Sequence, residues 1–351
     1  MSAIAAAASD PAFRVLRGTR QSRIALGGAI ALVAILATLP GWGDSGQLKV
    51  LVEFFTLLAM AQMWNLLAGY AGLVSIGQQA FIGLGAYGFF VAVDRLGMPI
   101  VPAVVVTAVA CGGVALVTSL FAFRLRGGYF AIGTWVIAEV FRIVVSNTRE
   151  LGAGTGVTIQ TAVRMVPADR QALTYWLALT VGAGSIVVAA FIMRSRLGLA
   201  LQAVRDNEVA ARSLGVDVYR AKLAIYLVAA VGCAAAGAVI YLQLLRIQPN
   251  AAFGVDWTAK MIFIVIIGGL GRIEGPVIGT IVFFTLQESL ADYGSLYLII
   301  LGLVAITITV VAPQGIWGTV TRYRPMALFG IQRRLVLEPV HPPGDPHGDD
   351  G

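Results

Sequence analysis

The sequence predicts an all-α integral membrane protein with about eight to ten transmembrane helices and both termini in the cytoplasm. Hydrophobic residues make up 58% of the 351 residues and charged residues only 12%, whereas soluble domains contain roughly 45–50% and about 25%. The mean hydropathy of the chain is +0.84. These values exclude a soluble enzyme, a disordered chain and a fibrous protein, and they indicate that most side chains face lipid or neighbouring membrane helices.

Ten hydrophobic segments account for this composition, since a membrane-spanning helix needs about 20 predominantly apolar residues. They cover residues 24–40, 48–69, 78–96, 99–123, 128–147, 173–193, 223–244, 258–271, 275–291 and 295–313. Glycine-rich junctions join the second segment to the third and the eighth to the ninth. Within 48–96 and 258–291, full crossings and re-entrant segments are both compatible with the sequence.

The basic residues predict the orientation, because positively charged loops stay in the cytoplasm. Four arginines precede the first span (Arg14, Arg17, Arg20 and Arg23), and successive crossings bring the basic loop 194–222 to the same side. The chain therefore divides into a cytoplasmic segment (1–23), a membrane domain (24–320) and a cytoplasmic tail (321–351). The end of the tail is rich in Pro, Gly and Asp, which predicts disorder there.

Rare residue types exclude several membrane activities. The two cysteines lie in apolar runs, and both histidines lie in the tail, so we expect no metal or haem site. No lysine follows a glycine, which excludes the Gly-Lys pair of a Walker A loop. We expect no cofactor on this chain and no nucleic-acid partner. If the protein uses ATP, another subunit binds it.

The loop 194–222 carries six basic and three acidic residues. Its pattern predicts a short amphipathic helix with one apolar face (Leu201, Val204, Ala211 and Leu214) and two ion pairs, Arg205–Glu208 and Glu208–Arg212. Gly215 is placed to end this helix in the left-handed conformation. Such a helix suits docking into a cleft on a soluble partner. An ordinary solvated loop helix is the alternative interpretation.

A glycine-rich passage at 69–87 contains Ser75, Gln78 and Gln79 within an apolar region. These side chains are costly when they face lipid, and irregular backbone at membrane depth requires burial in protein or a water-filled cavity. They are therefore candidates to line a translocation path. Hydrogen bonding between helices is an equal alternative.

A second glycine-rich passage at 268–279 contains Gly268, Gly269, Gly271 and Gly275, and Pro276 interrupts any single helix there. Two interrupted segments in different halves of a transporter often mark its binding site or gate. Close packing of small residues explains the same pattern without transport. Within another span, Glu139 and Arg142 are spaced to form a structural pair on one helix turn.

Three stretches together resemble the permease subunits of branched-chain amino acid ABC importers, the LivM type. They are NLLAGYAGLVSIGQQAFIGLGAYG (65–88), RSRLGLALQAVRDNEVAARSLGVDVYRAKL (194–223) and IIGGLGRIEGPVIG (266–279). The resemblance runs from about residue 24 to 320. It implies that Glu208, Ala210, Ala211 and Gly215 occupy the family's cytoplasmic coupling motif, with Arg205 and Arg212 beside them.

The resemblance implies a permease, not an enzyme, in a bacterial inner membrane. Its implied partners are a second related permease, two ABC ATPase subunits and a periplasmic binding protein that delivers leucine, isoleucine or valine. Sister systems of this type import urea, short amides or other small solutes, so the substrate stays open. An ion-coupled secondary transporter working alone and a purely structural membrane subunit are also compatible with the sequence, although few acidic residues lie within the spans.

Overall fold

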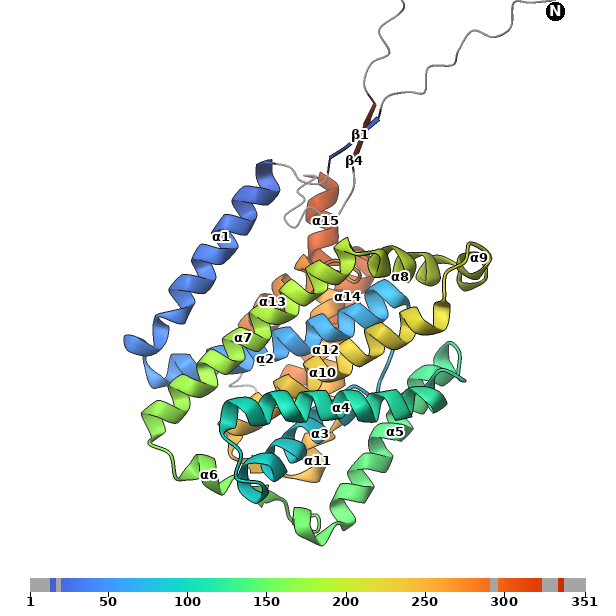
Figure 1. Cartoon of the computed structure of the whole chain (residues 1–351). Coiled ribbons are helices and arrows are strands. Elements are labelled where there is room, and N and C mark those ends of the chain that lie inside the picture. The colour runs from blue at the N-terminus through green and yellow to red at the C-terminus, as the bar shows by residue number, and fades with distance from the viewer. Residues whose placement is uncertain (1–12, 17–19, 291–295, 324–333, 338–351) are drawn as a thin grey trace, which may run out of the picture. The chain divides into compact units, whose positions relative to one another are not determined.

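The structure is a computed structural model that describes residues 13–16, 20–290, 296–323 and 334–337 (Figure 1). The chain forms two compact units, one from residues 1–29 and 326–351 and the other from residues 30–325. In the first unit, β1 (Phe13–Leu16) pairs with β4 (Arg334–Leu337) in antiparallel register, with Phe13 opposite Leu337. Residues 338–351, for which we predict disorder, lie outside the described residues.

Long helices build the second unit. They are α1 (Arg20–Ala37), which begins in the first unit, α2 (Ser45–Asn65), α3 (Gln79–Phe90), α4 (Ile100–Ala122), α5 (Gly128–Asn147), α7 (Pro167–Arg194), α10 (Val218–Leu244), α12 (Val255–Gly268), α13 (Glu274–Leu290), α14 (Leu296–Val311) and α15 (Gly315–Tyr323).

Short elements connect the long helices. They are η1 (Leu39–Gly41), η2 (Leu66–Tyr70), η3 (Val91–Arg95), η4 (Arg149–Leu151), α6 (Gln160–Val163), α8 (Arg196–Asp206), α9 (Glu208–Ser213), α11 (Pro249–Ala252) and the strand pair β2 (Val157–Thr158) and β3 (Arg246–Ile247).

The predicted all-α membrane class is confirmed. Among the described residues, seven helices are long and apolar enough to cross a membrane. They cover Ser45–Tyr70, Ile100–Ala122, Gly128–Asn147, Pro167–Arg194, Val218–Leu244, Pro249–Gly268 and Gly302–Arg322. The remaining predicted segments correspond to the shorter helices Gly27–Gly41, α3 and α13.

Helix α2 lies at the centre of the second unit. Every residue from 55 to 71 is buried, and α2 packs against α7, α10, α12 and α13 (Figure 1). A helix that is apolar on all sides is stable either inside the protein or in contact with lipid, and α2 is surrounded by protein. Helices α4 and α7 instead leave apolar side chains outside, such as Val109 (64% exposed) and Phe191 (76% exposed).

The junction between the second and third predicted segments is an unwound stretch, residues 71–78. The helix α3 that follows has 12 residues and continues directly into the five residues of η3. Together they span about 25 Å, which is shorter than the hydrocarbon core of about 30 Å. The unwound backbone is held by protein groups, because the Trp64 indole donates to the Ser75 carbonyl (2.8 Å) and the Ile76 amide donates to the Thr134 hydroxyl (3.2 Å). Irregular backbone is tolerated at membrane depth when it is buried in this way.

The eighth and ninth predicted segments form a tight hairpin of α12 and α13. A methyl group on Gly268 would overlap the carbonyl of Gly275, so only glycine permits this approach. Pro276 lies in the first turn of α13, where its missing amide costs no helical hydrogen bond. The turn between the helices uses positive φ at Gly269 (129°) and Gly271 (73°).

Candidate coupling site and buried polar cluster

The loop 194–222 forms two helices rather than the single helix we predicted. The Asn207 side chain ends α8 and caps α9, because its Oδ1 accepts hydrogen bonds from the amides of Val209 and Ala210 (3.0 Å each). Asparagine is among the preferred N-cap residues, since its side chain satisfies free amides of the first turn. Figure 1 shows α8 and α9 one after the other at one end of the bundle, where the chain passes from α7 to α10.

The break changes which residues share the apolar face. Leu201, Val204 and Ala211 are buried as predicted, but the prediction for Leu214 is wrong because its side chain is 82% exposed. The cause is the interruption at Asn207, which resets the helical phase before α9 begins. Val218, from the start of α10, completes the small apolar cluster with Val204 and Ala211.

Gly215 ends α9 as predicted. Its φ is +83°, which is the left-handed conformation that favours glycine, and its amide donates to the Arg212 carbonyl (3.0 Å). No atom lies within 4 Å of the position that a Cβ would take. Backbone conformation, and not crowding, is therefore the reason for glycine here.

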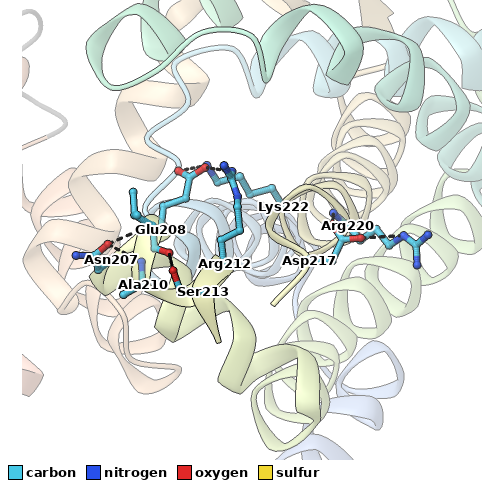
Figure 2. A network of polar contacts seen from close by, with 9 residues as sticks. Asn207, Glu208, Ala210, Arg212, Ser213, Asp217, Arg220 and Lys222 are labelled. Carbon is cyan, nitrogen blue, oxygen red and sulfur yellow. Dashed lines mark hydrogen bonds and ion pairs between the residues drawn. The ribbon is translucent and has the colours of Figure 1, made fainter. Parts of the chain in front are cut away.

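Glu208 is the centre of the polar network in Figure 2. Its carboxylate accepts a hydrogen bond from Lys222 Nζ (2.7 Å) and forms the predicted ion pair with Arg212 (3.5 Å). The hydrogen bond from Lys222 lowers the pKa of the Glu208 carboxyl below its ordinary value. The sequence pattern did not identify Lys222 as a partner, because the turn at Gly215 brings the two residues together across a large separation in sequence.

Arg205 does not pair with Glu208, so that prediction is wrong. Its guanidinium forms an ion pair with Asp206 (3.1 Å), and its Nη1 donates to the carbonyl of Gly69 (2.9 Å). This carbonyl lies in the last turn of the α2–η2 helix, where carbonyl groups lack helical partners and a positive charge is favourable. The last turn of α8 is thereby attached to the end of the central helix.

The end of the α2–η2 helix also contacts the second glycine-rich passage. The Asn65 side chain accepts from the amide of Gly271 and donates to the carbonyl of Arg272 (2.9 Å each). A Cβ on Gly69 would lie 2.5 Å from the Gly271 nitrogen. The structure therefore brings all three motifs together at the ends of α2, α8 and α12. Sequence reasoning missed Asn65, whose only signal was a polar amide in a long, mainly apolar run that also contains Gln62.

Ser75, Gln78 and Gln79 are buried, with at most 1% of each residue exposed. The Ser75 hydroxyl accepts a hydrogen bond from the backbone amide of Gly77 (3.2 Å), and the side-chain Oε1 of Gln79 accepts one from the Thr258 hydroxyl. Gln78 Oε1 and Gln79 Nε2 have no hydrogen-bond partner among the described residues. Part of the cluster thus bonds between helices, and its role in a translocation path stays a prediction.

Residues 47–309 match the family described as "Branched-chain amino acid transport system / permease component". The match covers most of the chain and contains the glycine-rich passages and the α8–α9 loop. The chain belongs to this family. As a member of the permease family with seven long apolar helices among its described residues, it is a multi-pass protein of the inner membrane.

Individual relatives agree with the family. The high-affinity branched-chain amino acid transport system permease protein LivM of Escherichia coli K12 is 23% identical over 313 residues, which cover 82% of this chain and 73% of that protein. A probable LivM of Methanocaldococcus jannaschii is 23% identical over 172 residues, 48% of this chain and 50% of that protein. The ribose import permease protein RbsC of Bacillus subtilis is 33% identical over 127 residues, 33% of this chain and 39% of that protein. All three relatives are transport permeases, not enzymes.

Proposed function

We propose that this permease imports branched-chain amino acids, driven by ATP hydrolysis on separate subunits. The contact between Arg205 and the Gly69 carbonyl carries this proposal, because it connects the peripheral helix α8 directly to the end of the central helix α2–η2. The proposed partners are two ABC ATPase subunits, a second related permease and a periplasmic binding protein. The permease itself binds no ATP.

The exposed surface of α9 suits an ATPase. Val209 (74% exposed) and Leu214 (82% exposed) are apolar side chains outside the membrane-spanning helices, and Ala210 between them is also exposed. Arg212 adds a positive charge at the same surface, with 66% of its side chain exposed. Ala211 is buried beneath and holds α9 on the protein. We therefore assign Ala210 to partner contact and Ala211 to support.

Motion would pass from α9 to the membrane through α8. When the ATPase subunits close, they displace α9, and the apolar cluster moves α8 with it. Arg205 then pulls on the end of α2, and Asn65 passes the displacement to the α12–α13 turn through Gly271. Because the interior is close-packed, displacement of the helix ends tilts whole helices rather than being absorbed locally. This is alternating access driven from outside the membrane.

Branched-chain amino acids are the proposed substrates because LivM of Escherichia coli K12 matches 82% of this chain, whereas the ribose permease of Bacillus subtilis matches 33% of it. Uptake of leucine, isoleucine, valine, ribose, urea and acetamide into vesicles that hold the complete complex will test this choice. We expect saturable uptake of the three amino acids only. Preferential uptake of ribose, urea or acetamide would change the proposed substrate but would leave the proposed role as an import permease intact.

The Arg205→Ala variant tests the coupling route. Losing a hydrogen bond from a charged donor costs about 1.5–3 kcal/mol, and 1.4 kcal/mol is about a factor of ten. We therefore expect leucine uptake to fall roughly tenfold while ATP hydrolysis continues. The matched control is Arg220→Ala, which removes a guanidinium from the same loop. The Arg220 side chain is 85% exposed. Equal uptake by the two variants would contradict the route, and uptake by vesicles without ATPase subunits would indicate a secondary transporter.

A further inference from the structure

The outward face of α5 carries charge where a lipid-facing helix would be apolar. Ile132 (57% exposed), Val136 (54%) and Ile143 (48%) form an exposed stripe at helical spacing. Glu139 lies in this stripe, with 45% of its side chain exposed. The opposite stripe is buried and consists of Ala131, Thr134, Ala138 and Val145.

Glu139 is deep in the span. It lies about 16 Å along the helix axis from Gly128 and about 12 Å from Asn147, at a rise of 1.5 Å per residue. The Arg142 Nε donates to both carboxylate oxygens of Glu139 (2.9 Å each), and Arg142 Nη1 donates to the side-chain Oδ1 of Asn250 (2.7 Å). The predicted Glu139–Arg142 pair is confirmed, and a third residue from α11 fixes its orientation.

Lipid is a poor environment for this pair. An ionised side chain at the centre of a membrane helix costs about 2.5–3.5 kcal/mol on insertion scales, and such residues almost always face protein or a water-filled cavity. Helix α4 provides the contrast, because its outward face is apolar (Val101, Val105, Val109 and Leu116) and the helix contains no charged residue. Two neighbouring spans thus differ: the outward face of α4 is apolar throughout, whereas the outward face of α5 is apolar around one ion pair.

We infer that the Ile132–Val136–Glu139–Ile143 face of α5 lines a water-filled translocation path, with the second permease subunit on its far side. The identity of that subunit rests on the proposed function. The ion pair offers a carboxylate to an ammonium group and a guanidinium to a carboxylate, which suits a zwitterionic solute. Trp135, 50% exposed on the same side, offers an apolar ring to the solute's side chain.

Cysteine accessibility tests this assignment directly. The native Cys111 and Cys233 are 4% and 0% exposed, so they provide an unreactive background. Single cysteines replace Val136 and Ile143 on α5, and Val109 on α4 is the lipid-facing control. The assembled complex in vesicles is treated with a charged, membrane-impermeant methanethiosulfonate. This reagent reacts with the thiolate, which forms only where water reaches the sulfur.

We expect Val136→Cys and Ile143→Cys to react at least about tenfold faster than Val109→Cys, since water access lowers the cost of forming the thiolate by more than about 1.4 kcal/mol. Equally slow reaction at all three positions would overturn the assignment, whether lipid or a dry subunit interface covers α5. The labelling needs no substrate, so its outcome is independent of whether the complex imports amino acids.

The charge pair has its own readout. The double variant Glu139→Gln with Arg142→Met removes both charges and leaves no unpaired charge. It keeps the shape of the Glu139 side chain and an unbranched side chain at 142. A pair in contact with the solute predicts a KM for leucine uptake raised severalfold, with a smaller change in the maximal rate. An unchanged KM with unchanged labelling at Val136→Cys would show that the pair is structural and would overturn its proposed contact with the solute.

Discussion

The α12–α13 hairpin and the 194–222 loop, which contains α8 and α9, both depend on glycine, but for opposite reasons. In the membrane hairpin, the backbones of Gly268 and Gly275 approach so closely that no side chain fits between them. In the 194–222 loop, Gly215 lies between α9 and α10, has free space around it and is required only for its φ of +83°. One region is held by close contact between helix backbones, whereas the other is held by a few polar contacts and a small apolar cluster.

This difference suits the two regions to different tasks. A close-packed hairpin moves as a unit and transmits displacement without deforming. The 194–222 loop is held by few contacts, so it can shift when a partner pulls on it, since its local stability is low. Asn65 and Arg205 connect the two regions through the end of the central helix. Asn65 accepts a hydrogen bond from the Gly271 amide of the hairpin turn, and Arg205 donates to the Gly69 carbonyl in η2. We therefore expect substitutions to have the largest effect in the α12–α13 hairpin, a smaller effect at the joint formed by Asn65 and Arg205, and the smallest effect in the 194–222 loop.

The largest effect is expected for Gly268→Ala. A methyl group there would overlap the Gly275 carbonyl, and backbone cannot move aside without separating the helices, so we expect a loss of several kcal/mol. The folded yield in detergent and the thermal midpoint measure this loss. The control is Gly113→Ala in α4, where nothing lies within 4 Å of the new Cβ. A variant at Gly268 as stable as this control would contradict the packed character of the hairpin.

The next largest effect is expected for Asn65→Leu at the joint. The variant leaves the Gly271 amide and the Arg272 carbonyl without their partner, at a cost of about 1–3 kcal/mol. Thermal unfolding of the purified protein reports this cost. Ser185→Ala is the matched control, because the Ser185 hydroxyl bonds to the Gly182 carbonyl of its own helix. If both variants unfold at the same temperature, Asn65 does not hold the joint together.

The sequence predicted those features that depend on local chemistry. Membrane helices follow from composition, the left-handed turn at Gly215 follows from helix-end preferences, and the Glu139–Arg142 and Glu208–Arg212 pairs follow from helical spacing. Each of these involves residues close together in the chain, and the structure confirms each one.

The contacts that the sequence did not predict are long-range or depend on one local choice. Arg205 had an apparent partner at i+3, but its guanidinium bonds to Gly69 through packing of α8 on α2. Asn207 could continue a helix or cap one, and capping placed Leu214 on the exposed side. The meeting of the three motifs depends on how distant helices pack, which a single sequence does not encode in any periodic pattern.

A smaller effect on stability, but a clear one on function, is expected for Gly215→Val. A non-glycine residue in the left-handed conformation costs about 1–2 kcal/mol, and the free space around Gly215 means that no clash adds to it. The variant should insert into the membrane normally but hydrolyse ATP with reduced leucine uptake, since α9 is mispositioned. Gly215→Asn is the control, because asparagine tolerates this conformation better. Full uptake by the valine variant would remove the turn from the coupling mechanism.

The smallest effect is expected from the titration of Glu208. The hydrogen bond from Lys222 lowers the pKa of this carboxyl in the folded protein, so its stabilisation is complete above the ordinary value of about 4.3 and is lost as the pH falls through the lowered pKa. The Glu208 side chain is 37% exposed, which limits the contribution to about 1 kcal/mol or less. The thermal midpoints of the native protein and of Glu208→Gln should therefore differ slightly at pH 7 and converge under acidic conditions. In a Lys222→Met background the difference should be small at every pH. A difference that is the same at every pH and with either residue at position 222 would show that the Glu208–Lys222 pair does not stabilise the 194–222 loop.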